Sequence, residues 1–186
     1  TAGGDGKISA WSGDNFSFLK SLPLCTEKVR TIAFDKDENI AAIGCGDGTI
    51  RIININDLKE IHRFNAHQLS VNALCFHPFL NILLSGGKDA HLKLWTTDDF
   101  QMIQSIPAHN YAIYSLCFSP DGDLFATGSR DKTIKIWNGE NFSFLLRIDH
   151  DKDEGHTHSV NKILWMNDVL ISAGDDKKII GWSISK

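Results

Sequence analysis

The sequence predicts an all-β protein in which four-stranded antiparallel sheets repeat along the chain. Runs rich in Ile, Val, Phe, Thr and Trp alternate with short turns that contain Gly, Pro, Asn or Asp. The residue that ends the third β-rich run of each unit recurs at intervals of 42, 42, 42 and 45 residues, at Trp11, Ile53, Trp95, Trp137 and Trp182. A repeat of about 40–45 residues with four strands is typical of the blades of a β-propeller.

The pattern is clearest between residues 108 and 138. Strands are expected at its three β-rich runs, 113–118, 124–128 and 133–137. The turn at 119–122 reads Ser-Pro-Asp-Gly, with Pro and Gly where a β-turn favours them, and the turn at 130–132 is short enough to form a tight hairpin. The unit is therefore predicted to be an antiparallel meander.

The same pattern predicts a single partial β-propeller domain over residues 1–186, with blades at about 1–22, 23–65, 66–107, 108–149 and 150–186. Three of these blades are expected to be complete and two to have three strands. The first blade is expected to hold strands at 1–3, 7–11 and 16–22, and the last to stop after its third strand. In the complete blades we expect four strands at 29–34, 40–44, 49–54 and 60–64, and outer strands at 101–106 and 142–148.

An arc of this kind leaves an apolar sheet face uncovered at each end. Uncovered apolar faces and free sheet edges are unfavourable in a stable monomer. We therefore expect the remaining blades of a closed ring to come from a longer chain or, as the alternative, from another copy of this chain.

Polar residues recur at fixed places in the repeat. An Asp stands six residues before the aligned position in all five units: Asp5, Asp47, Asp89, Asp131 and Asp176. A hydroxyl stands ten residues before it in four units: Thr1, Ser85, Thr127 and Ser172. A His opens three units: His67, His109 and His156. With Trp at the end of the unit, this pattern resembles the WD-repeat (WD-40) family of β-propellers over essentially the whole chain.

The resemblance implies that His, hydroxyl, Asp and Trp of one blade form a hydrogen-bonded chain. The three expected sets are His67, Ser85, Asp89 and Trp95; His109, Thr127, Asp131 and Trp137; and His156, Ser172, Asp176 and Trp182. Their donors and acceptors match in sequence, and an unpaired buried polar group costs about 1–3 kcal/mol. A Ser–His–Asp hydrolytic triad is the alternative. An active site has no reason to occur three times at one interval, so no catalytic residue is expected.

The second unit departs from the pattern. Cys25, Ile43 and Ile53 stand where His, hydroxyl and Trp are expected, and only Asp47 is kept. A partly satisfied polar network is less favourable than an apolar replacement. This blade is therefore predicted to be held by packing alone.

The composition limits the class of protein, the kind of partner and the cellular location that we expect. With 42% hydrophobic and 23% charged residues the chain has an ordinary globular composition, and no apolar run is long enough to span a membrane. The net charge of −4, with both signs interspersed, gives no basic stripe, so a nucleic-acid partner is not expected. Cys75 and Cys117 occupy the same place in successive first strands, which indicates packing rather than a disulfide framework or a metal site. We expect a cytoplasmic protein.

The loop at 149–158 is the one irregular connection. It contains Asp149, His150, Asp151, Asp153, Glu154, His156 and His158, residue types that can bind metals. Its spacing does not match a calcium-binding EF-hand loop. A solvated acidic loop is expected, with no metal and no cofactor.

The resemblance also implies where partners bind. In the family, the residue before the turn Asp and the residue after the start of the first strand surround the mouth of the central channel. These positions hold Gly4, Gly46, Lys88, Arg130 and Asp175, and Arg30, Asn72, Tyr114 and Asn161. We expect a non-catalytic scaffold that binds a protein or peptide through Arg30, Asn72, Lys88, Tyr114, Arg130, Asn161 and Asp175. The alternatives are merely exposed side chains at these positions, a propeller enzyme or metal-dependent site near 149–158, and a ubiquitin-ligase adaptor. Ser12, Thr96, Asn138 and Ser183 weaken the adaptor hypothesis, because an Asp often follows the Trp in such adaptors.

Overall fold

A computed structural model describes residues 1–184. Within them the strands form five antiparallel sheets, each a meander of consecutive strands. The first sheet contains β1 (Lys7–Trp11) and β2 (Phe18–Pro23). The second contains β3 (Val29–Phe34), β4 (Ile40–Cys45), β5 (Thr49–Asn54) and β6 (Lys59–Asn65). The third contains β7 (Val71–Phe76), β8 (Ile82–Gly87), β9 (His91–Thr96) and β10 (Met102–Pro107).

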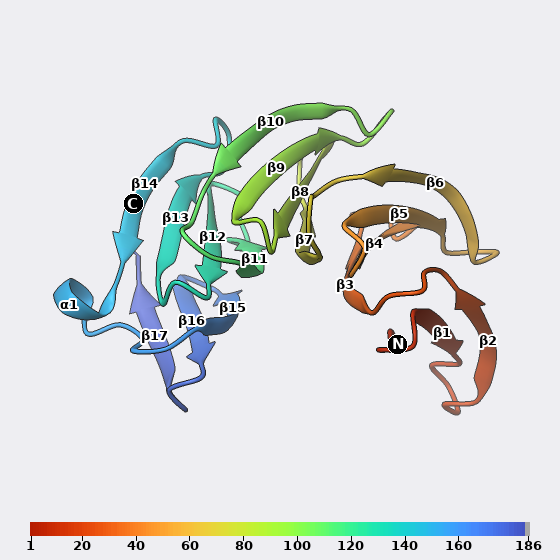
Figure 1. Ribbon diagram of the computed structural model, residues 1–186, viewed down its shortest axis with the longest axis horizontal. Helices are drawn as coiled ribbons and strands as arrows, with labels where there is room; N and C mark the ends of the chain where they lie inside the picture. Colours follow the sequence, from red (N-terminus) through yellow and green to blue (C-terminus); the bar gives the residue numbers. More distant parts are fainter. Residues whose placement is uncertain (185–186) are drawn as a thin grey trace.

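The fourth sheet contains β11 (Ile113–Phe118), β12 (Leu124–Ser129), β13 (Ile134–Asn138) and β14 (Phe144–Ile148). The last contains β15 (Val160–Met166), β16 (Val169–Gly174) and β17 (Ile179–Ser183). The sheets follow one another around an open arc, with β1 and β2 at one end and the β15–β17 sheet at the other (Figure 1). The predicted all-β fold of propeller blades is confirmed, as a partial ring.

The first sheet is smaller than expected. The strand predicted at 1–3 contributes one isolated bridge, between Ala2 and Ile8, so that β1 and β2 are its only named strands among the described residues. Gly3 and Gly4 follow at once, and glycine weakens a strand because it loses more conformational entropy and packs no side chain.

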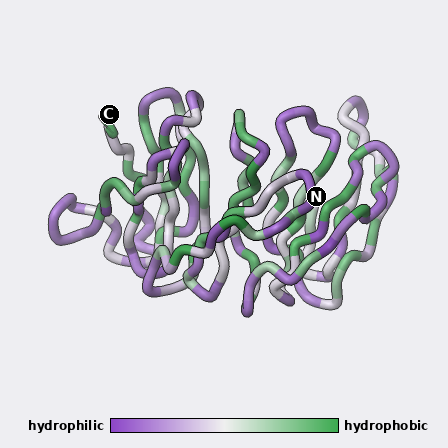
Figure 2. The backbone as a smooth tube through the Cα atoms, turned by 90° about the horizontal axis from the view of Figure 1, so that it is seen from above, coloured by the Kyte–Doolittle hydropathy of each residue, from purple (hydrophilic) through white to green (hydrophobic). Residues whose placement is uncertain are grey.

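The hydrophobic core lies between neighbouring sheets. Ile50 and Ile52 of the second sheet pack in one cluster with Val71, Leu74 and Trp95 of the third. Similar clusters fill the other junctions between successive sheets. Along the chain, hydrophobic segments follow the strands and hydrophilic segments gather in the connecting loops (Figure 2). Burial of apolar surface at about 25 cal/mol per Å² makes these junctions the main stabilising contacts.

The connection at 149–158 differs from the expected loop. Residues His150–Asp153 form a short helix, α1, whose N-cap Asp149 accepts hydrogen bonds from the backbone amides of Asp151 and Lys152. The Asp149 carboxylate also lies 3.4 Å from Arg147 Nε. The helix forms because an Asp in extended conformation precedes it and satisfies amides that a helix start leaves free. None of the helices in residues 1–184 has the length and apolar character to cross a membrane.

Candidate functional site

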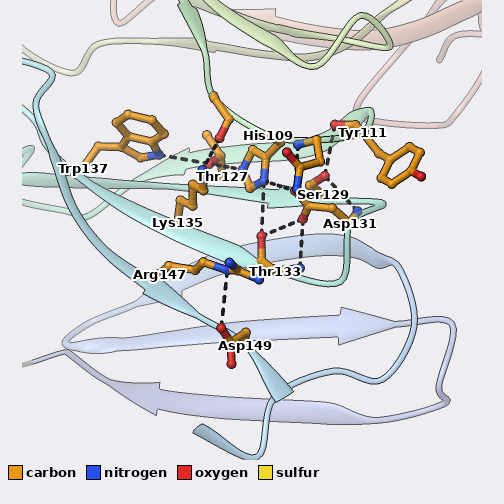
Figure 3. A network of polar contacts seen from close by, with 12 residues as sticks. His109, Tyr111, Thr127, Ser129, Asp131, Thr133, Lys135, Trp137, Arg147 and Asp149 are labelled. Carbon is orange, nitrogen blue, oxygen red and sulfur yellow. Dashed lines mark hydrogen bonds and ion pairs between the residues drawn. The ribbon is translucent and has the colours of Figure 1, made fainter. Parts of the chain in front are cut away.

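The fourth sheet contains a buried chain of side-chain hydrogen bonds (Figure 3). Trp137 Nε1 donates to Thr127 Oγ1 at 3.0 Å, and that hydroxyl lies 2.8 Å from His109 Nε2. His109 Nδ1 lies 3.0 Å from Asp131 Oδ2. With the proton on Nδ1, the indole donates to the hydroxyl, the hydroxyl to the imidazole and the imidazole to the carboxylate. Every donor in this chain therefore has an acceptor.

The third and last sheets contain the same arrangement. His67 Nε2 and Nδ1 lie 2.8 Å from Ser85 Oγ and 2.9 Å from Asp89 Oδ1, and Trp95 Nε1 lies 2.9 Å from the same hydroxyl. In the last sheet, the corresponding distances are 2.8 Å for His156 to Ser172, 2.9 Å for His156 to Asp176 and 2.8 Å for Trp182 to Ser172. The three imidazole side chains are completely buried. Each set of hydrogen-bonded side chains lies within one sheet. It joins the second and third strands of that sheet to the segment that precedes the first strand.

The protonation states of the His and Asp side chains follow from their burial and from these hydrogen bonds. Burial lowers the pKa of His109, and the adjacent Asp131 carboxylate opposes this only in part, so the imidazole is neutral near pH 7. Burial alone would raise the pKa of Asp89, but hydrogen bonds and the positive charge that His67 can carry lower it to about 2. The pKa of Asp131 is lowered in the same way, by His109 and Thr133 against the effect of burial. The carboxylates therefore stay ionised as acceptors.

The repeated Asp, which lies in the turn before the third strand of each unit, has a second function that the sequence pattern did not reveal. In all five units its carboxylate accepts a hydrogen bond from the backbone amide two residues later, for example Lys7 to Asp5 at 3.2 Å and Thr49 to Asp47 at 2.9 Å. The residue between them has positive φ: Gly6, Gly48, Ala90, Lys132 and Lys177. An Asx turn of this kind stabilises the tight hairpin locally. Asp is therefore kept in units that lack His, because the turn itself needs it.

The second sheet does not rely on packing alone, and that prediction is wrong. Arg51 is buried, and its guanidinium lies 3.1 Å from Glu60 Oε2 and 3.6 Å from Asp47 Oδ2. Burial would raise the pKa of Asp47, but hydrogen bonds from Thr49 and the charge of Arg51 lower it. The Arg occupies the place of Lys93 and Lys135 in the next two sheets. An ion-pair cluster therefore replaces the missing imidazole as the partner of the turn Asp.

The starts of the first strands and the turns between second and third strands lie at the same edge of the arc, which we call the top face. Backbone bonds fix this: Gly46 N donates to Lys28 O, Lys88 N to Ser70 O, and Asp175 N to Ser159 O, at 2.8, 2.8 and 3.0 Å. An open hollow of about 400 Å³ is lined there by Arg30, Asn72, Tyr114, Asn161 and Asp175. These side chains come from four successive sheets.

The hollow has a polar and partly fixed lining. Asn72 accepts a hydrogen bond from Ser70 Oγ at 2.9 Å, and the Asn161 side-chain amide donates to the Asp175 carboxylate. Five of the seven expected partner-binding residues meet there. Lys88 and Arg130 are exposed on the same face but do not line the hollow, and Arg130 lies over the ring of Tyr111, 5.8 Å from its centroid. Tyr111 is a top-face residue that the repeat did not mark, because it lies in the connection before β11.

A metal-dependent site near 149–158 was the alternative hypothesis, and two of the His side chains there have hydrogen-bond partners within the protein. His156 is bonded to Ser172 and Asp176, and His150 Nδ1 lies 3.0 Å from the Gly155 carbonyl. Within residues 1–184, no group of three or more His, Cys, Asp or Glu side chains is arranged to hold a metal ion.

Comparison with known proteins agrees with the fold. A family model described as "WD domain, G-beta repeat" matches residues 16–54, 58–96 and 100–138. Each matched repeat begins near the outer strand of one sheet and ends with the third strand of the next, so each repeat links two successive sheets.

Among solved structures, that of the computationally designed protein Ika8 is similar, with a TM-score of 0.80 and 28% identity over 98% of this chain and 54% of the designed chain. The chain thus spans about half the length of that protein. A comparison with curated proteins gave no match. Since three successive repeats covering more than half of its length match the family model, the chain belongs to the WD-domain, G-beta repeat family of β-propellers.

Proposed function

We propose that this chain is a non-catalytic scaffold whose top face holds a protein or peptide partner. The single observation that carries the proposal is the hollow in which Arg30, Asn72, Tyr114, Asn161 and Asp175 meet from different sheets. WD repeats generally form propeller scaffolds for protein interactions.

The chemistry of the hollow suits an extended polypeptide. Arg and Tyr are among the side chains enriched where binding energy is concentrated, and the Asn amides can pair with peptide groups. Arg30 and Asp175 supply opposite charges, so a partner with both charge signs is favoured over a nucleic acid. Lys88 and Arg130 would extend the contact along the same face.

The non-catalytic part of the proposal rests on burial. The Ser85–His67–Asp89 distances resemble those of a hydrolytic triad, but the Ser85 hydroxyl is wholly buried and already accepts the Trp95 indole N–H. A substrate carbonyl cannot reach it. We expect no labelling of Ser85 by a fluorophosphonate probe. Stoichiometric labelling of Ser85 would contradict the proposal that the chain is non-catalytic.

A displayed library of random peptides tests the binding part. Peptides that bind the wild-type chain should lose about tenfold or more in affinity with Arg30→Ala or Tyr114→Ala, because such side chains dominate binding energy. Arg63→Ala is the matched control, since Arg63 is an exposed arginine on the outer strand β6. Peptides that bind all four proteins equally would contradict the proposal. The cytoplasmic location and the absence of nucleic-acid and membrane partners remain predictions of the sequence.

A further inference from the structure

The second sheet carries two cysteines at places where its neighbours carry other residues. At the 42-residue interval, Cys25 corresponds to His67 and His109, and Cys45 corresponds to Gly87 and Ser129. The sheet that lost the imidazole therefore has thiols at two positions that face each other in the other sheets.

The backbone holds these positions in the same way in the second and third sheets. Cys25 N donates to Gly6 O at 3.2 Å, as His67 N donates to Gly48 O at 3.0 Å. Cys45 is paired with Val29 as Gly87 is paired with Val71, at the start of the first strand in each sheet. The geometry between positions 67 and 87 therefore applies to positions 25 and 45.

That geometry brings the two Cβ atoms close together. A Cβ built on Gly87 would lie 2.7 Å from His67 Cγ, which is one carbon–carbon bond from His67 Cβ. The two Cβ positions are therefore no more than about 4.2 Å apart. In disulfides the Cβ atoms are about 3.5–4.5 Å apart. The repeat thus places Cys25 and Cys45 within bonding geometry although 20 positions separate them in the sequence.

The two thiols differ in their access to solvent. Both belong to the same apolar cluster, but Cys45 is completely buried and Cys25 is half-buried. Burial, together with the neighbouring Cys25 thiol and the negative charge of Asp47, raises the pKa of Cys45 to about 12. Cys25 is therefore the thiol that a reagent from solvent meets first.

We propose that Cys25 and Cys45 form a reversible disulfide in response to a two-electron oxidant of the peroxide class. The Cys25 thiolate attacks one peroxide oxygen; the O–O bond breaks, and Cys25 becomes a sulfenic acid. The other oxygen leaves as hydroxide, which takes up the proton that the Cys25 thiol released and becomes water. The Cys45 sulfur then attacks the Cys25 sulfur; the S–S bond forms, the S–O bond breaks, and the hydroxyl leaves as water with the Cys45 proton. Two thiols are oxidised by two electrons and hydrogen peroxide is reduced to two waters.

The bond would fix part of the top face. It would join the segment before β3 to the end of β4, beside the turn that contains Asp47. The same turn is attached to β3 at its start, because Gly46 N donates to the carbonyl of Lys28. Arg30, which lines the hollow, lies two positions after Lys28. In the third, fourth and last sheets a His–Asp contact makes this connection without a covalent bond.

The test uses the whole chain, oxidised with stoichiometric hydrogen peroxide and digested with trypsin without reduction. The peptides 21–28 and 37–51 contain Cys25 and Cys45 separately. The expected product is their cross-link, two hydrogens lighter than the two peptides together, which dithiothreitol abolishes and which neither Cys25→Ser nor Cys45→Ser forms. Oxidation should also raise the Tm of the wild-type chain by about 5 °C, because a closed loop restricts the unfolded chain.

The same digest contains its control. Cys75 and Cys117 are also close to each other, but they lie on different sheets, and burial raises the pKa of their thiols to about 11 and 12. Their peptides should stay reduced. Sulfinic or sulfonic acid at Cys25 without the cross-link, a bond between two molecules through Cys25, or a Cys75–Cys117 bond in its place would each overturn the proposal. The wild-type digest alone decides this, even where a Ser variant fails to fold.

Discussion

The His77 Nε2–H group donates a 3.1 Å hydrogen bond to the carbonyl oxygen of Gly139, which follows β13 in the neighbouring sheet. The other ring nitrogen of His77 accepts hydrogen bonds from the amides of Phe79 and Leu80, at 3.0 and 2.9 Å. The ring also packs edge-on against Phe118, with 4.6 Å between centroids. One buried side chain therefore holds its own turn and the next sheet together.

Replacement of His77 should destabilise the junction of the third and fourth sheets. His77→Ala leaves the Gly139 carbonyl and two amides without their partner, which is expected to cost about 2 kcal/mol of unfolding free energy. Urea unfolding followed by Trp fluorescence measures the loss. His158→Ala is the control, since His158 is exposed and should change stability by less than about 0.5 kcal/mol. Equal stability of the two variants would contradict the assigned role of His77.

Thr127→Val tests the hydrogen-bond chain of the fourth sheet. The isosteric change removes the hydroxyl that joins Trp137 to His109, so two buried polar groups lose a partner and stability should fall by about 2–4 kcal/mol. Trp137→Phe should then cost less in the Thr127→Val background than in the wild type, because the indole has already lost its acceptor. Additive losses in this double-mutant cycle would show that the hydroxyl does not couple the two groups.

Arg51→Met tests the ion-pair cluster that replaces the imidazole in the second sheet. Asp47 and Glu60 lose the cation between them, and an unfolding cost of about 1–2 kcal/mol is expected, reduced by their partial access to solvent. Arg63→Met removes an exposed partner of Glu60 and should have almost no effect. Unfolding midpoints of both variants at low and high salt provide the measurement. A loss in Arg63→Met as large as in Arg51→Met would refute the distinction between them.

Stability should decline in acid in two stages. Burial lowers the pKa of His77 and His109, so the unfolded chain takes up protons more readily below its ordinary His pKa of about 6.5, and this contribution is present above that pH and lost as pH falls below it. Asp89 and Asp176 have pKa values of about 2, so their contribution is present above about pH 4 and lost as pH falls toward 2. Urea midpoints between pH 7.5 and 2 measure both stages.

A variant separates the first stage from general acid effects. His77→Gln removes one of the two imidazoles with a lowered pKa and should flatten the decline between pH 6.5 and 5. A wild-type midpoint that stays constant across this interval would show that the buried imidazoles do not resist protonation.

Much of the architecture could be predicted from local sequence. The strands follow from β-branched and aromatic runs, and the turns from Gly, Pro and Asp at fixed places, since both depend on neighbouring residues. The same interval also indicated which His, hydroxyl, Asp and Trp belong to one sheet. The strand predicted at 1–3 is reduced to one bridge at Ala2, next to Gly3 and Gly4. The helix α1 was not predicted, because it depends on a single N-cap, Asp149.

Particular pairs of residues in contact between units were not predicted from the sequence. His77 meets Gly139 across 62 positions, and nothing in either local pattern marks the pair. The sequence did not predict the Cys25–Cys45 pair either, because two thiols can form a disulfide only where the fold brings them together. The hollow gathers Tyr114 with residues of three other sheets, as the resemblance implied, but Lys88 and Arg130 do not line it.

The sequence by itself determined the repeat, the all-β class and the polar set that belongs to each sheet, because these arise from short-range patterns that recur at a fixed interval. Only the tertiary structure decided which residues of different sheets touch, how Arg51 compensates for a lost imidazole, and where the top face is hollowed. Such contacts depend on how successive sheets rotate and pack against one another, and no single repeat contains that information.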